Sequence, residues 1–141
     1  MNTAQIDTLI GSEGIKQAYH ESLDNETSLD IICLASDYAE VIGDFFDKEY
    51  APKLYNSAMQ SREILPDKFD NHEYASKKDL SKNQVRFIEN TPSESDIILG
   101  DRKAVIVSYN RKAPFAIIIR DHEMITGLKN QFQALWKSLE K

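Results

Sequence analysis

The sequence has one cysteine, five glycines and no long apolar run among its 141 residues. A lone cysteine, Cys33, cannot form a disulfide within the chain, so the protein needs no oxidising compartment. No apolar segment approaches the roughly 20 residues of a membrane-spanning helix. The N-terminus also lacks the basic and apolar segments of a signal peptide. These absences predict a cytoplasmic protein that does not bind membranes.

The residue patterns that mark common catalytic and cofactor sites are missing as well. His20, His72 and His122 have no second histidine or cysteine at metal-ligand spacing. The glycines form neither a P-loop nor a dinucleotide fingerprint, and no serine lies in a nucleophile elbow. Cys33 falls in a predicted buried strand, where a free cysteine usually packs as a small hydrophobe. The sequence therefore predicts no metal, no cofactor, no catalytic residue and no enzymatic activity.

Basic residues are too few to balance the acidic ones: 17 Lys and Arg against 23 Asp and Glu give a net charge of −6. Nucleic-acid binding relies on Lys and Arg that displace counterions. The acidic balance therefore predicts no direct nucleic-acid binding. The basic pairs Lys77-Lys78 and Arg111-Lys112 stand isolated, as is typical of solvated loops. With 41% apolar and 28% charged residues, the chain has the composition of one globular domain, 1–141.

Hydrophobic periodicity divides the first two thirds of the chain into alternating helices and strands. The first ten residues fit either a strand or a helix, and Ser12 is a candidate N-cap for the helix that follows. An apolar run over 29–35 predicts a buried strand. A long helix is expected to open at Asp37 and to break or kink at Pro52. Strands over 62–65 and 84–88 flank a short polar helix over 70–78.

The last third has the clearest pattern. Strands over 95–99, 103–109 and 114–120 predict a β-meander, and the turn at 100–102 is expected to use the tolerance of Gly and Asp for positive φ. Asp121 then caps a closing helix. The apolar residues of this helix recur at spacings of three and four: Ile125, Leu128, Phe132, Leu135, Trp136 and Leu139. The fold class predicted is a mixed α/β sheet that ends in a meander and a helix.

Two groups of side chains could form a site. Five aromatic residues lie along 38–55 and could line a ligand pocket, a dimer face or the core: Tyr38, Phe45, Phe46, Tyr50 and Tyr55. The spacing favours the core for the first three, while Tyr50 and Tyr55 flank Pro52 and could lie at a surface. Glu94 and Asp96 lie on the same side of a strand and could form an acid/base pair or a solvated edge. No third group joins them, so we assign them no catalytic role.

Five sets of segments share an order and spacing along nearly the whole chain: GSEGIKQAY (11–19), REILPD (62–67), QVRF (84–87), SDIILGD with AVIVS (95–108), and PFAIII with FQALW (114–136). Together they resemble the effector domain of TrmB-like transcriptional regulators. That domain is similar in fold to one half of a phospholipase-D-like unit. The resemblance implies a mixed sheet with helices on both faces.

The resemblance also implies a role and partners. It suggests transcription regulation through a small-molecule effector, a sugar or similar, and a homodimer or a regulatory protein partner. TrmB-like regulators carry an N-terminal winged helix that binds DNA. Only about ten residues precede the similar region here, so we expect no DNA-binding domain.

The motif of phospholipase-D-like enzymes tests for activity. It reads His-x-Lys-x4-Asp, in which the His forms a phospho-enzyme and the Lys binds phosphate. With Asp101 at the Asp of the motif, Glu94 stands at the His position and Asp96 at the Lys position. Ser108 and Asn110 fall near the later Ser and Asn of the family. Two acids would repel a phosphodiester, so the resemblance implies no phospholipase or nuclease activity by this mechanism.

A ligand pocket is expected at the carboxyl ends of the central strands, where open α/β sheets bind ligands. The side chains predicted to contact the ligand are Arg86, Asp96, Ser108 and Asn110. Each also has a purely structural interpretation: Arg86 could pair with a carboxylate, and Ser108 and Asn110 could end a strand.

Three hypotheses about function follow. The first is a ligand-sensing module. The second is a dimerisation or protein-interaction module, which an apolar surface near Tyr50, Pro52 and Tyr55 would favour. The third is a degenerate hydrolase, which would need a cleft with perturbed acids at Glu94 and Asp96.

Overall fold

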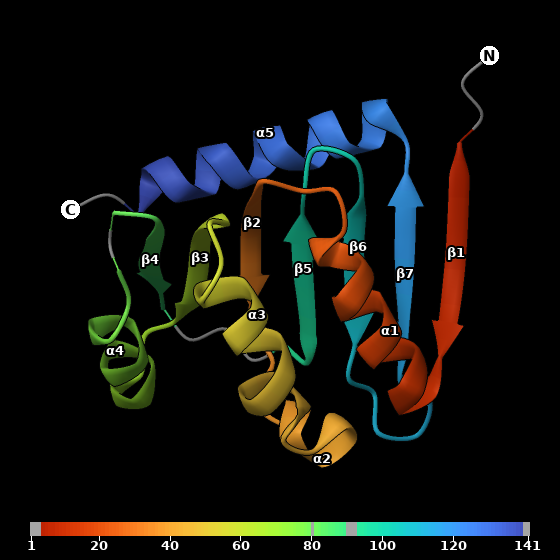
Figure 1. Ribbon diagram of the computed structural model, residues 1–141, viewed down its shortest axis with the longest axis horizontal. Helices are drawn as coiled ribbons and strands as arrows, with labels where there is room; N and C mark the ends of the chain where they lie inside the picture. Colours follow the sequence, from red (N-terminus) through yellow and green to blue (C-terminus); the bar gives the residue numbers. More distant parts are fainter. Residues whose placement is uncertain (1–3, 80, 90–92, 140–141) are drawn as a thin grey trace.

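A seven-stranded mixed sheet forms the centre of the molecule, seen in the computed structural model, which describes residues 4–79, 81–89 and 93–139. The strands stand side by side in the order β1-β7-β6-β5-β2-β3-β4 (Figure 1). Their bounds are β1 Gln5–Ile10, β2 Ser28–Cys33, β3 Gln60–Pro66, β4 Asn83–Ile88, β5 Ser95–Leu99, β6 Ala104–Ser108 and β7 Phe115–Arg120.

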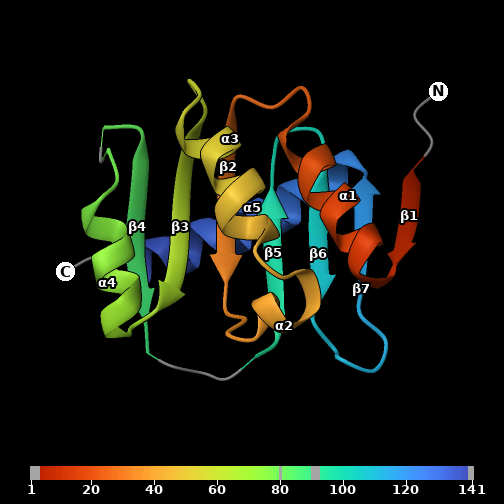
Figure 2. The same ribbon diagram turned by 60° about the horizontal axis from the view of Figure 1, so that its bottom comes forward.

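Helices cover both faces of the sheet. They are α1 Gly11–Leu23, α2 Tyr38–Ile42, the π-helical turn η1 Phe46–Tyr50, α3 Ala51–Tyr55, α4 Phe69–Ser76 and α5 His122–Ser138. The long α5 crosses behind the sheet, while the others lie in front of it (Figure 2). Each side has its own core: one cluster contains Ile15, Tyr19, Ile31 and Val105, and the other contains Ile64, Leu99, Phe132 and Trp136. The predicted fold class is confirmed.

The sheet has a parallel half and an antiparallel half. Strands β2, β3 and β4 run parallel and are joined by helical crossovers, whereas β5, β6, β7 and β1 are antiparallel neighbours. The N-terminal segment is a strand because all six residues of β1 pair with β7. Strand β2 also pairs antiparallel with β5. The carboxyl ends of β2 and β3 therefore lie beside the beginning of β5, at the same end of the central strands.

The helix starts differ from prediction. Ser12 lies inside α1, which begins directly after β1 without a side-chain cap. The long helix expected from Asp37 is three short pieces. Its break lies at Gly43, whose φ of 62° and ψ of −134° suit glycine. Pro52 does not break a helix, because it lies in the first turn of α3, where no N–H donor is needed.

The β5–β6 hairpin also differs from prediction, because its turn uses no positive φ. Gly100 is needed for space instead: a Cβ there would lie 2.2 Å from the Glu26 carboxylate. That carboxylate is buried and accepts hydrogen bonds from the amides of Asp101, at 2.8 Å, and Arg102, at 3.0 Å. A distant side chain therefore closes this turn.

Two of the remaining helical expectations are confirmed and one is corrected. Asp121 caps α5, its carboxylate accepting from the amide of Met124 at 3.0 Å. The apolar stripe of α5 packs on the sheet as predicted. Tyr50, in contrast, does not lie at a surface: it is 2% exposed and packs in the core. Within the described residues, no helix has the length and apolar character to cross a membrane.

Candidate functional site

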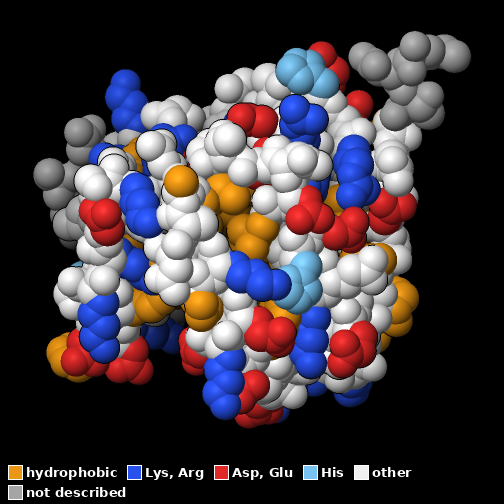
Figure 3. All heavy atoms as spheres, in the orientation of Figure 1, with side chains coloured by type: hydrophobic (Ala, Val, Ile, Leu, Met, Phe, Trp, Pro, Cys, Tyr) orange, Lys and Arg blue, Asp and Glu red, His pale blue; other side chains and the backbone are white. Residues whose placement is uncertain are grey.

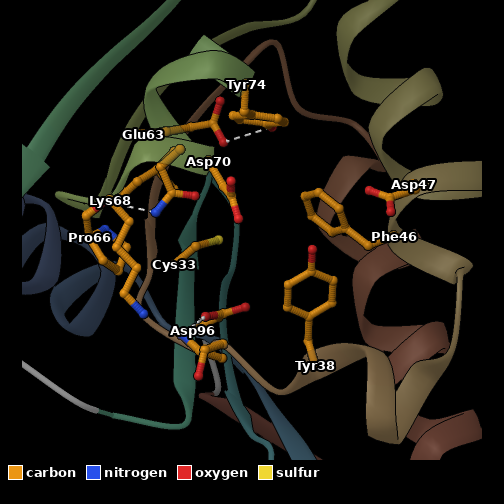
Figure 4. A pocket seen from close by; sticks show the side chains of 14 residues that line it. Cys33, Tyr38, Phe46, Asp47, Glu63, Pro66, Lys68, Asp70, Tyr74 and Asp96 are labelled. Carbon is orange, nitrogen blue, oxygen red and sulfur yellow. Dashed lines mark hydrogen bonds between the residues drawn. The ribbon is translucent and has the colours of Figure 1, made fainter. Parts of the chain in front are cut away.

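A cavity of about 330 Å³ opens where the carboxyl ends of β2 and β3 meet the start of β5. Helices α2 and α4 and the turn η1 form its outer walls (Figure 4). The side chains that line it are polar or aromatic for the most part: Cys33, Ser36, Tyr38, Phe46, Asp47, Glu63, Lys68, Asp70, Asn71, Tyr74 and Asp96, with Ala35, Leu65 and Pro66.

Asp96 lies at the base of the cavity and is 4% exposed. Its carboxylate accepts from the Tyr19 hydroxyl at 2.9 Å and from the Ala35 amide at 3.2 Å, and the Cys33 thiol donates to it. The Tyr19 hydroxyl also bonds to that of Tyr109. Burial raises the pKa of Asp96 to about 6, although its hydrogen bonds work in the opposite direction. The carboxylate is thus held rigidly and ionises near neutral pH.

Glu63, at 1% exposure, is the second buried carboxylate of the cavity. The Tyr55 hydroxyl donates to it at 2.6 Å and the Tyr74 hydroxyl at 3.4 Å. The two tyrosine hydroxyls also bond to each other. Burial raises the pKa of Glu63, while the hydrogen bond from Tyr55 lowers it. The Lys78 ammonium lies 3.0 Å from the centre of the Tyr55 ring and 3.8 Å from that of Tyr74.

The mouth of the cavity adds two exposed carboxylates, Asp47 and Asp70, and one lysine, Lys68. Tyr38 and Phe46 form an aromatic wall, with ring centres 5.6 Å apart. In Figure 4 this wall faces Cys33, Asp70 and Glu63 across the open space. The cavity therefore combines acidic groups with an aromatic surface.

Of the four residues predicted to contact a ligand, only Asp96 lines this cavity. Arg86 is in register with Ile64 and faces α5, where it donates to the Trp136 carbonyl and stacks on the indole ring. Ser108 lies at the end of β6, on the same face as Ile106, which packs toward α5.

The fourth predicted residue, Asn110, lies exposed in the β6–β7 connection. Its side chain accepts from the Lys112 amide, and its own amide donates to Ser108 Oγ. The structure thus brings Ser108 and Asn110 together at the end of β6, and Ser108 lies on the face of the sheet opposite to Asp96, which pairs with Val107.

Glu94 and Asp96 do not form a pair. The Glu94 carboxylate accepts from Ser36 Oγ at 3.0 Å and from the Asp37 amide at 3.1 Å, which ties down the segment before α2. It is exposed and does not line the cavity. The predicted solvated edge is therefore correct for Glu94 and wrong for Asp96, which is buried.

Among the residues that the structure describes, no group of three or more His, Cys, Asp and Glu has the arrangement to hold a metal ion. The three histidines lie outside the cavity. Cys33 lines it, but burial, followed by the charge of Asp96, raises the pKa of the thiol well above its usual value. A neutral thiol is a poor nucleophile.

Sequence reasoning missed Glu63 and Tyr74, and placed Tyr38 and Phe46 in the core. A signal for Glu63 was present: it is an acid within a short, otherwise apolar strand, and a buried charge needs partners. Tyr74 carried no such signal, because it lies in a short polar helix.

The similarity of this chain to known proteins is found in solved structures. No protein-family model and no curated protein matches the sequence. Among solved structures, TrmBL2, described as an archaeal chromatin protein with a novel mode of DNA binding, is 16% identical with a TM-score of 0.61. The similarity covers 96% of this chain and 53% of TrmBL2, so the chain spans about half the length of that protein.

Two similar structures are bacterial. NucT from Helicobacter pylori is 12% identical, with a TM-score of 0.65 over 96% of this chain and 98% of NucT. Nuc from Salmonella typhimurium, a phospholipase D family member, is also 12% identical, with a TM-score of 0.61 over 96% of this chain and 95% of Nuc. The chain therefore has the phospholipase-D-like fold that the sequence resemblance implied, shared with TrmBL2.

The comparison corrects the expected partners. The acidic charge predicted no direct nucleic-acid binding, yet the same fold occurs in TrmBL2, a DNA-binding chromatin protein. The exclusion of nucleic acid is therefore wrong as an inference from charge. On the face shown in Figure 3, basic and acidic side chains are interspersed, so net charge does not describe the local surface. The small-molecule effector and the homodimer, the other expected partners, stay predictions.

Proposed function

We propose that this chain is a regulatory domain related to those of TrmB-like proteins, and that its cavity binds a small ligand without transforming it. The observation that carries the proposal is the cavity itself: two buried carboxylates, Asp96 and Glu63, are oriented by hydroxyl and amide donors beside open space. Burying a carboxylate costs free energy. Placing two at the wall of one cavity favours recognition over mere stability.

The absence of a poised nucleophile among the cavity residues supports the non-catalytic part of the proposal. The resemblance to phospholipase-D-like enzymes puts acids where those enzymes have His and Lys. Asp96 lies in the cavity and Glu94 lies outside it, so even an acid/base pair of these two is not assembled. The degenerate-hydrolase hypothesis therefore loses the second acid that it required.

The first test is thermal unfolding against a panel of amines, carboxylates, polyols and nucleotides. A ligand present at about a hundred times its Kd should add roughly 2.7 kcal/mol to the free energy of unfolding, which raises Tm by several degrees. The shift should disappear in Asp96→Ala and persist in Glu13→Gln, whose carboxylate is exposed on α1. A shift that survives Asp96→Ala would place the ligand elsewhere.

A second test concerns catalysis. Bis(4-nitrophenyl) phosphate is a chromogenic phosphodiester, and we expect the protein to release no nitrophenolate from it above the buffer rate. Release that is lost in Asp96→Asn would overturn the non-catalytic proposal.

A further inference from the structure

We propose that the ligand of this cavity is a small organic cation, an ammonium group carried on an apolar body. This rests on the proposed function of the cavity as a ligand site. The ammonium would be held by the acidic side of the cavity, with Glu63 and Asp70, and the apolar body would pack against Tyr38 and Phe46.

The charge of the cavity wall selects the sign of the ligand. Four carboxylates line it, those of Asp47, Glu63, Asp70 and Asp96. Among the described residues one cation, Lys68, lines the cavity, and a second, Lys78, lies beside Glu63 and over the Tyr74 ring. The carboxylates come from four separate elements and connections, so their gathering is a product of the fold. Like charges repel most strongly where water is partly excluded. An anionic ligand would therefore be disfavoured, and a cation attracted.

The chain itself supplies an example of cation binding at this wall. The Lys78 ammonium lies over the rings of Tyr55 and Tyr74, within 3.0 and 3.8 Å of their centres. The hydroxyls of the same two tyrosines bond to Glu63. An ammonium over an aromatic ring is stabilised by the ring quadrupole, more so when it is desolvated. Because Tyr74 and Glu63 also line the cavity, this cluster can act on a cation from the cavity side as well.

The aromatic wall supplies the second half of the recognition. Tyr38 and Phe46 are partly buried against the core, and their rings are tilted by 56° with centres 5.6 Å apart. They face the acidic side across the cavity (Figure 4). Such a pair buries an aromatic or aliphatic body and adds a π face for the cation. A simple metal ion would leave this wall without a function.

The experiment uses three probes of one shape and different charge: benzylamine, benzyl alcohol and benzoate. Binding is measured by two-dimensional amide NMR titration of the whole chain, which also reports where each probe binds. We expect benzylamine to bind about tenfold more tightly than benzyl alcohol, and benzoate to bind most weakly. The shifted amides should belong to residues around Cys33, Tyr38 and Tyr74.

Two matched double variants distinguish the effect of charge at the cavity from the effect of the net charge of the chain. Asp47→Asn/Asp70→Asn removes two exposed carboxylates at the mouth, where folding should tolerate the change. Glu13→Gln/Glu123→Gln removes the same net charge from exposed positions elsewhere. The first should weaken benzylamine binding several-fold, and the second should leave it within about twofold.

The outcomes distinguish two failures. If benzyl alcohol or benzoate binds the cavity as tightly as benzylamine, the cation inference is wrong and the cavity remains a ligand site. If none of the three shifts the cavity amides at millimolar concentration, the cation inference fails. The proposed ligand site then fails as well only if no compound of the thermal panel gives a shift that Asp96→Ala removes.

Discussion

The two ends of the sheet both bury charge, but they satisfy it differently. At the β5–β6 hairpin, Glu26 accepts from two backbone amides, and Lys103, 6% exposed, donates to the carbonyls of Glu21 and Asp24 at the end of α1. At the other end, Glu63 is held by two tyrosine hydroxyls, Asp96 by a tyrosine hydroxyl, a backbone amide and a thiol, and both carboxylates border a cavity. At the hairpin, which we call the closed end, the buried charges close a turn and a helix end through backbone partners. At the cavity, which we call the open end, the buried carboxylates line open space and are available to a ligand.

The largest loss of stability is expected when the contact between Glu26 and the hairpin amides, at the closed end, is broken. Gly100→Ala would push the Glu26 carboxylate, which is 8% exposed, off the hairpin amides, leaving a buried charge without its donors, and should cost about 3 to 4 kcal/mol of unfolding free energy. Glu26→Ala should cost a similar amount. Chemical denaturation of the double mutant should show that Gly100→Ala adds almost nothing once Glu26 is gone. Additive costs would mean that the two residues do not act through the same contact.

At the open end, we expect a pH dependence of stability. The native pKa of Asp96 is about 6, against 3.8 for the ordinary group, so between these values the native state binds more protons than the unfolded state. The unfolding free energy therefore falls as pH rises through this window. At about 1.4 kcal/mol per pKa unit, the loss is on the order of 3 kcal/mol or less.

Asp96→Asn should remove that slope between about pH 4 and pH 7. Urea denaturation at several pH values measures the slope of the unfolding free energy. The pKa of Glu63 is also raised, but Glu63 titrates in both proteins, so the difference between them reports Asp96. Parallel curves for the two proteins would contradict the assignment.

The Asp121 cap tests whether burial of the carboxylate explains the large loss of stability expected at the hairpin. Its carboxylate also accepts from a backbone amide, but at an exposed helix end. In Asp121→Ala, water can replace the carboxylate, so we expect a loss of only about 1 kcal/mol by thermal or chemical unfolding. A loss as large as that of Glu26→Ala would show that burial is not what distinguishes the hairpin.

The smallest change in stability is expected for Lys78, at the open end. Lys78 is half-buried, and burial lowers its pKa to about 8. Lys78→Gln removes a cation beside Glu63, and should cost less than about 1 kcal/mol in stability. The same change should strengthen benzylamine binding about two- to threefold, because the acidic wall loses its internal counter-ion. Weaker binding in the titration would show that Lys78 supports the site rather than competing with the ligand.

Local signals predicted the parts of the fold that depend on neighbours in sequence. Asp121 and the stripe of α5 were identified from the cap type and the spacing of three and four, and both are confirmed. Ser12 shows the limit of such signals. The start of α1 is set by Gly11, which has a φ of 77° and donates to the Pro114 carbonyl, in the connection between β6 and β7.

The candidate site was predicted only in part for a related reason. Alternation along β4 and β5 shows that Arg86 and Asp96 each lie on one face of the sheet, but not which face. The register with Ile64 turns Arg86 toward α5, and the register of Cys33 with Asp96 turns Asp96 into the cavity. Glu63 was overlooked because its tyrosine partners lie on helices whose packing the sequence does not show.

Apart from the first ten residues and the pieces of the helix after Asp37, the sequence by itself determined the order of helices and strands, the closing meander and capped helix, and the resemblance to a phospholipase-D-like half domain. Hydrophobic spacing and cap chemistry act over a few residues and can be recognised without a structure. The tertiary structure alone decided that β3 and β5 both flank β2, which brings Glu63 and Asp96 to one cavity. Strand pairing between distant segments depends on packing free energy summed over the whole sheet, and no local pattern encodes it.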